Sequence, residues 1–344
     1  MANTSLAVLD LVPVSSGSTA AEALRNSIDL ARAAERFGYT RYWFAEHHLN
    51  PGVAGTSPAV VLALTAAATS AIRIGSGAVQ MGHRTALATV EEFGLIDALY
   101  PGRLDLGLGR SAGVSPRLLA SPRLQLNKTL LQLPGASPQD YAEQVSDILA
   151  LLAGGYRSPD GIEAHVVPGE GADVQVWILG SSGGQSAQVA GANGLRFAAN
   201  YHVSPATVLE AVEGYRAAFR PSAELSRPYV AVSADVVVGP DEATARELAT
   251  GYGLWVRSIR SGDGAIAFPT PEEARKYTWT GADRALVADR VDTQFVGSPA
   301  QVADQLERLE EATGADELII TTITHDHADR VCSYELLARE WSRR

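Results

Sequence analysis

Histidines are the residues of this chain whose placement most strongly suggests chemistry. Six of the seven follow short apolar segments of the kind that form strands: His47, His48, His83, His202, His325 and His327. A neutral imidazole takes up or releases a proton near neutral pH, and it also binds transition metals. The pattern therefore indicates acid–base catalysis or metal binding at a place where several strands end.

The densest group is Glu46-His47-His48, at the end of an expected strand over 41–45. These residues could be metal ligands, a catalytic base with a neighbour that orients it, or polar groups that only pack. Successive side chains of an extended strand point to opposite faces. We therefore expect one histidine to serve chemistry and the other to pack.

A catalytic metal is the less favoured interpretation. In His325-Asp326-His327 the two histidines share a face of an extended chain, but Asp326 also fits as the N-cap of a following helix. Zinc sites need three or four ligands, and several of the expected strands end in few residues that could bind a metal. We expect no metal, and a metal-dependent hydrolase is kept as an alternative.

A possible phosphate site lies between an expected strand and an expected helix, in the segment Gly-Ser-Ser-Gly-Gly-Gln-Ser over 180–186. Small residues let backbone N–H groups converge, and a helix N-terminus adds partial positive charge. The residues that would hold the phosphate are Ser181, Ser182, Gly183 and Gly184. Arg110, from a neighbouring loop, would be the charged partner. Alternatively, Ser182 or Ser186 only caps the helix.

The elements that would position these residues alternate between strands and helices. Strands are expected over 5–11, 41–45, 72–79, 104–108, 174–179, 195–199, 229–238 and 317–322. Helices are expected over 20–37, 58–70, 85–100, 138–153, 186–193, 205–219, 240–256, 299–313 and 327–341. Eight strand–helix units predict parallel strands with right-handed crossovers, which close naturally into a (β/α)₈ TIM barrel.

Three stretches are typical of insertions into that α/β barrel: 112–137 and 154–172, between the fourth and fifth strands, and 257–292, after the seventh. Without them the length approaches the roughly 250 residues of a typical barrel, so we expect one domain over residues 1–344. The third insertion carries several glycines and could act as a closing lid. An open doubly wound sheet is the competing fold, but no GxGxxG turn follows the first strand.

Composition excludes several classes of protein. A formal charge of −11 and a sequence pI near 5.1 argue against nucleic-acid binding, which needs a basic face. Cys332 is the only cysteine, which excludes intrachain disulfides and cysteine-based zinc sites. The first residues lack the basic region of a signal peptide, and the longest apolar run is about half of the ~20 residues that cross a membrane. We expect a cytoplasmic protein.

Several motifs, taken in order, resemble the bacterial luciferase-like flavin monooxygenases. They are Tyr-Trp-Phe-Ala-Glu-His-His over 42–48, Ile-Arg-Ile-Gly-Ser-Gly-Ala-Val over 72–79, and the segments 91–111, 297–299 and 316–322. Together they span nearly the whole chain outside the insertions. The resemblance implies a barrel that binds reduced flavin mononucleotide (FMN) and activates O₂ through a C4a-peroxyflavin.

The resemblance also implies roles for single residues. His47 corresponds to the acid/base near the flavin, and His48 to a neighbour that faces the subunit contact, where Glu91 of the partner chain could pair with it. Gly77-Ala78 matches a non-prolyl cis peptide under the flavin ring. The phosphate contacts correspond to Arg110 and the turn 181–184. The further residues expected near the substrate are Glu46, His48, Gln80 and His202.

Two departures from the family pattern stand out. Gly109 replaces the cysteine of the light-emitting luciferases, and the phosphate turn reads Ser-Ser-Gly-Gly instead of a Ser/Thr-rich version. The helix expected over 58–70 is rich in alanine, which permits close packing, and in the family this helix lies in the dimer contact. We expect a homodimer; the alternative is an ordinary barrel helix packed on the sheet.

These expectations combine into a two-component, FMN-dependent monooxygenase. Because the sequence has no GxGxxG turn, we expect no dinucleotide site and a separate NAD(P)H:flavin reductase that supplies reduced FMN. The expected reaction is hydroxylation or epoxidation of an organic substrate, by resemblance an aromatic polyketide in antibiotic biosynthesis. The alternatives are a flavin-binding barrel without turnover and an oxidoreductase of the same fold that uses the deazaflavin F420.

Overall fold

The strands form a closed barrel in the structure, a computed structural model that describes residues 4–110, 122–132 and 139–344. The eight parallel strands are β1 (Ser5–Asp10), β2 (Arg41–Phe44), β3 (Arg73–Ser76), β5 (Leu104–Gly109), β6 (Val174–Gly180), β7 (Arg196–Ala199), β8 (Val230–Val238) and β10 (Glu317–Thr321). Neighbours pair in this order, and β10 pairs with both β8 and β1. The predicted (β/α)₈ barrel is confirmed.

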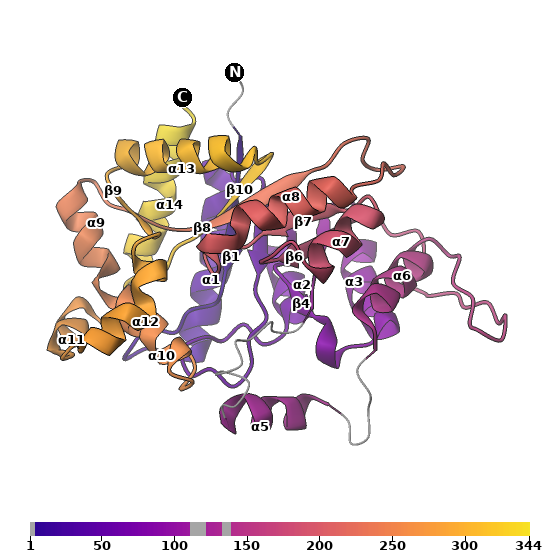
Figure 1. Cartoon of the computed structure of the whole chain (residues 1–344), viewed down its shortest axis with the longest axis horizontal. Helices are drawn as coiled ribbons and strands as arrows, with labels where there is room; N and C mark the ends of the chain where they lie inside the picture. The colour runs from indigo at the N-terminus through magenta and orange to yellow at the C-terminus, as the bar shows by residue number, and fades with distance from the viewer. Residues whose placement is uncertain (1–3, 111–121, 133–138) are drawn as a thin grey trace.

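Helices cover the outside of this barrel (Figure 1). They are α1 (Ala20–Phe37), α2 (Pro58–Ala68), α3 (Ala86–Leu99), α6 (Tyr141–Leu152), α7 (Gln185–Ala192), α8 (Val208–Ala218), α13 (Pro299–Thr313) and α14 (His327–Trp341). Local sequence explains their ends. Thr19 and Glu22 form a capping box at the start of α1, and Gly38 ends that helix with a φ of 87°, a left-handed conformation that glycine adopts without strain.

Three predicted elements differ from the structure. The predicted strand 72–79 is broken at Gly77 and Ala78 into β3 and β4 (Val79–Gln80), and the 3₁₀ helix η1 (Met81–His83) follows. The predicted helix 205–219 begins as the 3₁₀ turn η2 (Pro205–Thr207). The predicted helix 240–256 is divided into α9 (Glu242–Leu248) and α10 (Tyr252–Arg260) by the 3₁₀ turn η3 (Ala249–Gly251).

The insertions contribute elements of their own. Within the first, residues 112–121 and 133–137 lie outside the described residues, and α5 (Pro122–Leu131) lies between them. The third forms α11 (Pro271–Lys276) and α12 (Gly281–Val291) beside α10. Figure 1 shows the two chain termini at one end of the molecule and α5, α10 and α11 toward the other. No helix within the described ranges is long and apolar enough to cross a membrane.

Residues 263–268, which we call the strap, connect α10 to α11 and are held to the barrel by backbone hydrogen bonds. Three of these bonds are Phe268 N to Val14 O (2.8 Å), Ser16 N to Phe268 O (2.9 Å) and Gly52 N to Ala265 O (2.7 Å). The loops after β1 and β2 therefore both hold the strap. The insertion predicted as a lid is closed against the barrel in this structure.

The interior of the barrel is packed along its length. Trp43 and Trp177 meet edge to face inside it, with ring centroids 4.9 Å apart. At the amino-terminal ends of the strands, the buried guanidinium of Arg41 forms ion pairs of 2.9 Å with both Asp105 and Glu317. This ion cluster fills that end of the barrel.

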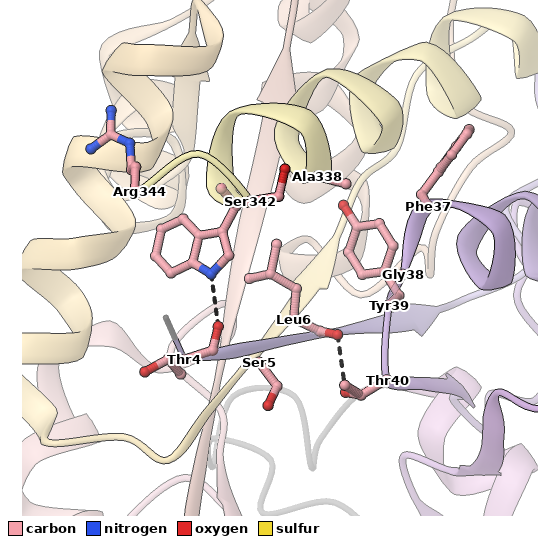
Figure 2. A pocket seen from close by; sticks show the side chains of 11 residues that line it. Thr4, Ser5, Leu6, Phe37, Gly38, Tyr39, Thr40, Ala338, Ser342 and Arg344 are labelled. Atoms are coloured by element: carbon pink, nitrogen blue, oxygen red, sulfur yellow. Dashed lines mark hydrogen bonds between the residues drawn. The ribbon is translucent and has the colours of Figure 1, made fainter. Parts of the chain in front are cut away.

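A hollow on the molecule also lies at this amino-terminal end, between β1, the end of α1 and the end of α14 (Figure 2). Its polar groups form hydrogen bonds between distant segments of the chain. Trp341 Nε1 donates a hydrogen bond of 2.7 Å to Thr4 O, and Thr40 Oγ1 donates one of 3.1 Å to Leu6 O. In a TIM barrel, residues at this end ordinarily stabilise the fold, whereas catalytic residues lie at the opposite end.

Candidate active site

The predicted site residues meet at the carboxyl ends of the strands. His47 and His48 follow β2, Gln80 ends β4, and Arg110 follows β5. The turn over 181–184 joins β6 to α7, and His202 follows β7. Because parallel strands of a barrel all end on one side, these residues share a single mouth.

Glu46 is the centre of a hydrogen-bond cluster at this mouth. Its Oε1 accepts bonds from Nε2 of His48 and Nε2 of His83, each at 2.9 Å, and its Oε2 accepts one from the backbone N of Gln80, also at 2.9 Å. Burial alone would raise the pKa of this carboxyl, but the donors outweigh burial and bring the pKa to about 2. Glu46 is therefore ionised at neutral pH and joins the ends of β2 and β4.

His47 and His48 have different surroundings. His48 binds Glu46, and its ring meets that of His83 edge to face with centroids 5.1 Å apart. The side chain of His47 has no hydrogen bond within the described part of the chain. Burial, and then the adjacent His48, lower the pKa of His47 to about 4, so its imidazole is neutral at neutral pH. The two histidines therefore differ in their contacts, but strand alternation does not cause the difference, because β2 ends at Phe44. The assignment of one histidine to chemistry and one to packing stays a prediction.

The Glu46 cluster also meets the distance requirement for a metal site, because the ligand atoms of Glu46, His48 and His83 lie within 4.8 Å of one another. Two features favour hydrogen bonding instead. Both histidines already donate to the carboxylate, and Nε of Arg84 lies 3.5 Å from the same Oε1. A bound dication would therefore face a fixed cation.

His325 and His327, the other candidate ligands, diverge in the structure. His327 Nε2 lies 2.9 Å from Asp29 Oδ2 on α1, and His325 Nε2 lies 3.1 Å from the carbonyl oxygen of Ser16. Asp326 is the N-cap of α14 and accepts a hydrogen bond of 2.8 Å from a backbone amide of its first turn. The capping interpretation of Asp326 is confirmed.

The peptide bond between Gly77 and Ala78 is cis, as the resemblance implies. The space around it is tight. A Cβ on Gly77 would lie 2.7 Å from Leu9 Cδ1, and a Cβ on Gly109 would lie 3.1 Å from the Cβ of Ala78. Glycine at position 109, the departure from the luciferases, therefore keeps the space beside Ala78 free.

The turn between β6 and α7 enters the helix without a side-chain cap. Gly184 occupies the N-cap position, and no side chain accepts a bond from the first amides of α7. The prediction that Ser182 or Ser186 caps this helix is therefore wrong. Arg110 reaches the same place and donates a hydrogen bond of 2.9 Å to Oε1 of Gln185, the first residue of α7. An anion bound here would meet uncapped amides and a guanidinium.

Helix α8 supports this turn from outside. Gly183 N donates a hydrogen bond of 3.2 Å to Oε1 of Glu210, and the hydroxyl of Thr207 donates to Ser181 O. Of the four residues predicted to hold phosphate, Gly183 therefore has its amide engaged, and the amide of Gly184 donates a hydrogen bond of 3.4 Å to Ser182 Oγ.

His202 belongs to a second polar group, on the far side of the mouth. Its Nδ1 lies 2.5 Å from Oγ of Ser233 on β8. Two residues further along β8, the buried Asp235 pairs with Arg290 of α12 at 3.0 Å and accepts a bond from Tyr252. The prediction missed Ser233 and Asp235. Their signal was two polar residues spaced two apart in an apolar strand, which places both on the interior face.

A parallel barrel with ionisable side chains and an uncapped helix start at one mouth has the arrangement typical of (β/α)₈ enzymes, whose sites lie at the carboxyl ends of the strands. The model of the luciferase-like monooxygenase family matches residues 4–317. The chain belongs to the luciferase-like monooxygenase family.

Similar proteins cover almost the full chain. The uncharacterized protein YvbT of Bacillus subtilis is 38% identical over 346 residues, which cover 99% of this chain and 98% of YvbT. A luciferase-like monooxygenase of Escherichia coli K12 is 36% identical over 331 residues, 96% of this chain and 94% of its own. The crystal structure of apo-MsnO8 superposes with a TM-score of 0.86 at 32% identity, over 99% of this chain and 98% of that chain.

Two structures of lower identity share the fold. One is the oxygenating constituent of 3,6-diketocamphane monooxygenase of Pseudomonas putida in complex with FMN, with a TM-score of 0.70 at 18% identity over 99% of each chain. The other is an F420-dependent secondary alcohol dehydrogenase, with a TM-score of 0.65 at 16% identity over 98% of this chain and 99% of that chain.

Proposed function

We propose that the protein is a reduced-FMN-dependent monooxygenase that inserts one oxygen atom of O₂ into an organic substrate. The observation that carries this proposal is the unbonded imidazole of His47 at the same mouth as the uncapped start of α7. Membership of the luciferase-like monooxygenase family supports it, and so does the FMN-bound structure with the same fold.

The residues at the mouth fit FMN. Arg110 and the first amides of α7 would hold the phosphate, and Gly77 and Ala78 would lie beneath the ring. When bound, the reduced flavin supplies the electrons that activate O₂. We choose FMN over F420 because the motifs of this chain resemble those of the FMN-dependent monooxygenases.

His47 acts in this proposal as a base. Its pKa of about 4 leaves the imidazole unprotonated at neutral pH, so it accepts a hydrogen bond or a proton from a hydroxyl or a water molecule. The sequence left both the acid and the base role open. The lowered pKa supports the base.

Anaerobic titration with reduced FMN tests the proposal. We expect saturable binding, and we expect Arg110→Ala to weaken the affinity for FMN by about tenfold, because it removes a charge-assisted contact to phosphate. The affinity for riboflavin, which lacks the phosphate, should not change. Absence of binding of both reduced FMN and reduced F420 would refute the proposal, and equal weakening for riboflavin would remove Arg110 from the phosphate site.

We also propose that a separate NAD(P)H:flavin reductase supplies the reduced FMN. The lack of a GxGxxG turn in the sequence supports this. The purified chain mixed with FMN and NADH should consume no NADH until a flavin reductase is added. Rapid consumption without the reductase would contradict the two-component scheme.

The substrate that we propose is an aromatic polyketide, hydroxylated or epoxidised in antibiotic biosynthesis. The resemblance of the motifs supports this choice, and so does the aromatic packing around the mouth by Trp255 and Phe268. Assays of aromatic polyketides with reduced FMN and O₂ test it by the mass of the product. A flavin-binding barrel without turnover predicts bound flavin and no oxygenated product.

We further propose that the protein is a homodimer that pairs through α2 and α3. These neighbouring helices carry large exposed apolar side chains: Val60 (61% exposed), Leu64 (55%), Leu95 (57%) and Leu99 (74%). Exposed apolar residues grouped on one face are typical of an interface between proteins. Glu91 is exposed on α3, and its pairing with His48 of the partner subunit remains part of this proposal.

A further inference from the structure

His202 and His47 lie on opposite sides of the barrel mouth. In the ring of eight strands, three strands separate β2 from β7 on each side. Even so, the two imidazoles interact electrostatically, because His47 is among the groups that lower the pKa of His202. A molecule bound at the centre of the mouth would therefore have one imidazole on each side.

The contacts of His202 favour the tautomer that carries its hydrogen on Nδ1. Nδ1 lies 2.5 Å from Ser233 Oγ, and Ser233 Oγ donates in turn to the carbonyl oxygen of Ala199 at 3.4 Å. The hydroxyl of Ser233 has one hydrogen, so both contacts are hydrogen bonds only if Nδ1 is the donor to Ser233. Nε2 then carries a lone pair, and it has no hydrogen-bond partner within the described ranges.

The surroundings keep His202 neutral. Burial is the largest influence and lowers the pKa of His202 to about 4; Asp235 opposes this, while Arg290 and His47 add to it. The negative charge of Asp235 is balanced by the positive charge of Arg290 in a buried ion pair. At neutral pH, Nε2 is therefore an uncharged acceptor at the mouth.

The apolar walls indicate what kind of molecule would meet this acceptor. The buried cluster that fills the barrel includes Leu179 near the end of β6, Phe268 of the strap and Trp255 of α10. Flat apolar surface fits walls of this kind, and a buried acceptor selects a ligand that carries a donor, because a ligand without one leaves the acceptor unpaired.

We propose that His202 is a substrate-binding base, and that the substrate is an aromatic compound whose hydroxyl group donates to Nε2 of His202, opposite His47. This inference rests on the proposed monooxygenase function and specifies its substrate as a phenol. The phenol keeps its proton in the ground state, because the pKa of His202 is about 4 and that of a phenol is about 10. No bond is broken and no electrons are exchanged. The hydrogen bond to Nε2 increases the electron density on the phenol oxygen and makes the ring more reactive toward an electrophilic oxygen donor.

Fluorescence of β-naphthol tests the inference, with its methyl ether as the matched ligand. Excited β-naphthol releases its proton to a nearby base, so the ratio of naphtholate to naphthol emission reports an acceptor at the hydroxyl. With FMN-loaded protein we expect β-naphthol to bind at least about tenfold more tightly than the ether, and to emit as naphtholate. No preference for β-naphthol over the ether would overturn the inference.

Two variants assign the effect to His202. His202→Leu should lose the preference and the naphtholate emission, whereas His165→Leu, at an exposed histidine of the second insertion, should keep both. Ser233→Ala should reduce the preference and convert part of His202 to the other tautomer, as observed by nitrogen NMR of the imidazole. This variant provides the test if His202→Leu fails to fold. An unchanged preference in Ser233→Ala, with His202 still wholly in the Nδ1–H form, would overturn the assignment.

The loading step separates this inference from the proposed function. Protein that binds no flavin at all would refute the function. Protein that binds FMN normally but does not distinguish β-naphthol from its ether would refute only the role of His202.

Discussion

The imidazole of His47 has no hydrogen-bond partner within the described part of the chain, while Nε2 of the adjacent His48 donates to Glu46. A side chain that the fold leaves unbonded at an enzyme's mouth is available to a ligand. The neighbouring cluster has the opposite property, since the Nε2 atoms of His48 and His83 and the backbone N of Gln80 all donate to the carboxylate of Glu46. At the scale of the residue, His47 is therefore available to a ligand, while the adjacent Glu46 and His48 hold the surrounding loops in place.

His47→Ala should reduce the yield of oxygenated product by about a hundredfold or more, the ordinary contribution of a general base. Binding of reduced FMN should remain within about twofold of wild type, because the proposed phosphate contacts are elsewhere. The measurement is the ratio of product to hydrogen peroxide for each reduced FMN consumed. His327→Ala, on the outside of the barrel, is the control. A wild-type yield in His47→Ala would exclude His47 from the reaction.

Glu46→Gln should change how stability depends on pH. The pKa of Glu46 is lowered from 4.5 to about 2 in the folded protein, so the ionised carboxylate contributes about 3 kcal/mol above pH 4.5. That contribution is lost as the pH falls through about 2. Urea unfolding should show the variant less stable than wild type by about 2–3 kcal/mol at neutral pH, and nearly equal to it near pH 2.

The control for this experiment is Glu92→Gln, at the more exposed carboxylate that pairs with Arg84. It should change stability by about 0.5 kcal/mol or less at any pH. A deficit of Glu46→Gln that stays constant from neutral pH to about pH 2 would show that the charge of Glu46 does not stabilise the fold.

At the scale of the element, the strap is the feature that gives the mouth its shape. It binds the loops after β1 and β2 through the main chain, and the loop after β2 carries His47. The close approach depends on Gly52, where a Cβ would lie 1.7 Å from the carbonyl oxygen of Ile266. No side chain fits there unless the strap moves.

Gly52→Ala should therefore displace the strap and cost about 1–3 kcal/mol, the usual penalty for overpacking. Hydrogen exchange should accelerate at the amides of Gly52, Ser16 and Phe268, which form the backbone bonds between the strap and the loops after β1 and β2. Gly281→Ala is the matched control, because a Cβ there meets nothing within 4 Å. Unchanged exchange in Gly52→Ala would mean that these bonds tolerate the displacement.

Elements with a repeated apolar pattern could be predicted from the sequence, and α1, α13 and α14 have the predicted bounds. Elements without a pattern could not. The strand β9 (Phe295–Gly297), which pairs with the far end of β8, was not predicted because three residues are too few for a periodicity. The prediction placed His83 at a strand end, but η1 determines its contact with Glu46, and no local signal specifies that turn.

The candidate site follows the same rule. Residues that sit next to strand ends were found, because barrel geometry places them at one mouth. Arg290 was not found, because its contact with Asp235 joins α12 of an insertion to β8, and only the closed fold brings the two together. The Ser182 and Ser186 capping hypothesis failed because Gly184 occupies the N-cap position of α7 instead.

At the scale of the whole molecule, the proposed dimer forms through the exposed apolar side chains of α2 and α3. Leu64→Glu combined with Leu95→Glu should convert the protein to a monomer, because each places a charge in an apolar contact. Sedimentation velocity measures the change. Leu209→Glu, at an equally exposed leucine on α8, should leave the mass unchanged. A wild-type protein that sediments as a monomer would refute the dimer.

The ion cluster of Arg41, Asp105 and Glu317 also bears on how cofactor, substrate and product enter and leave the barrel. Its buried side chains occupy the interior at the amino-terminal ends of the strands, so under the proposed function we expect cofactor, substrate and product all to enter and leave at the carboxyl ends. Spent FMN has to depart before a fresh molecule arrives. Release of oxidised FMN would then limit the rate of turnover, and an excess of oxidised FMN would inhibit the enzyme.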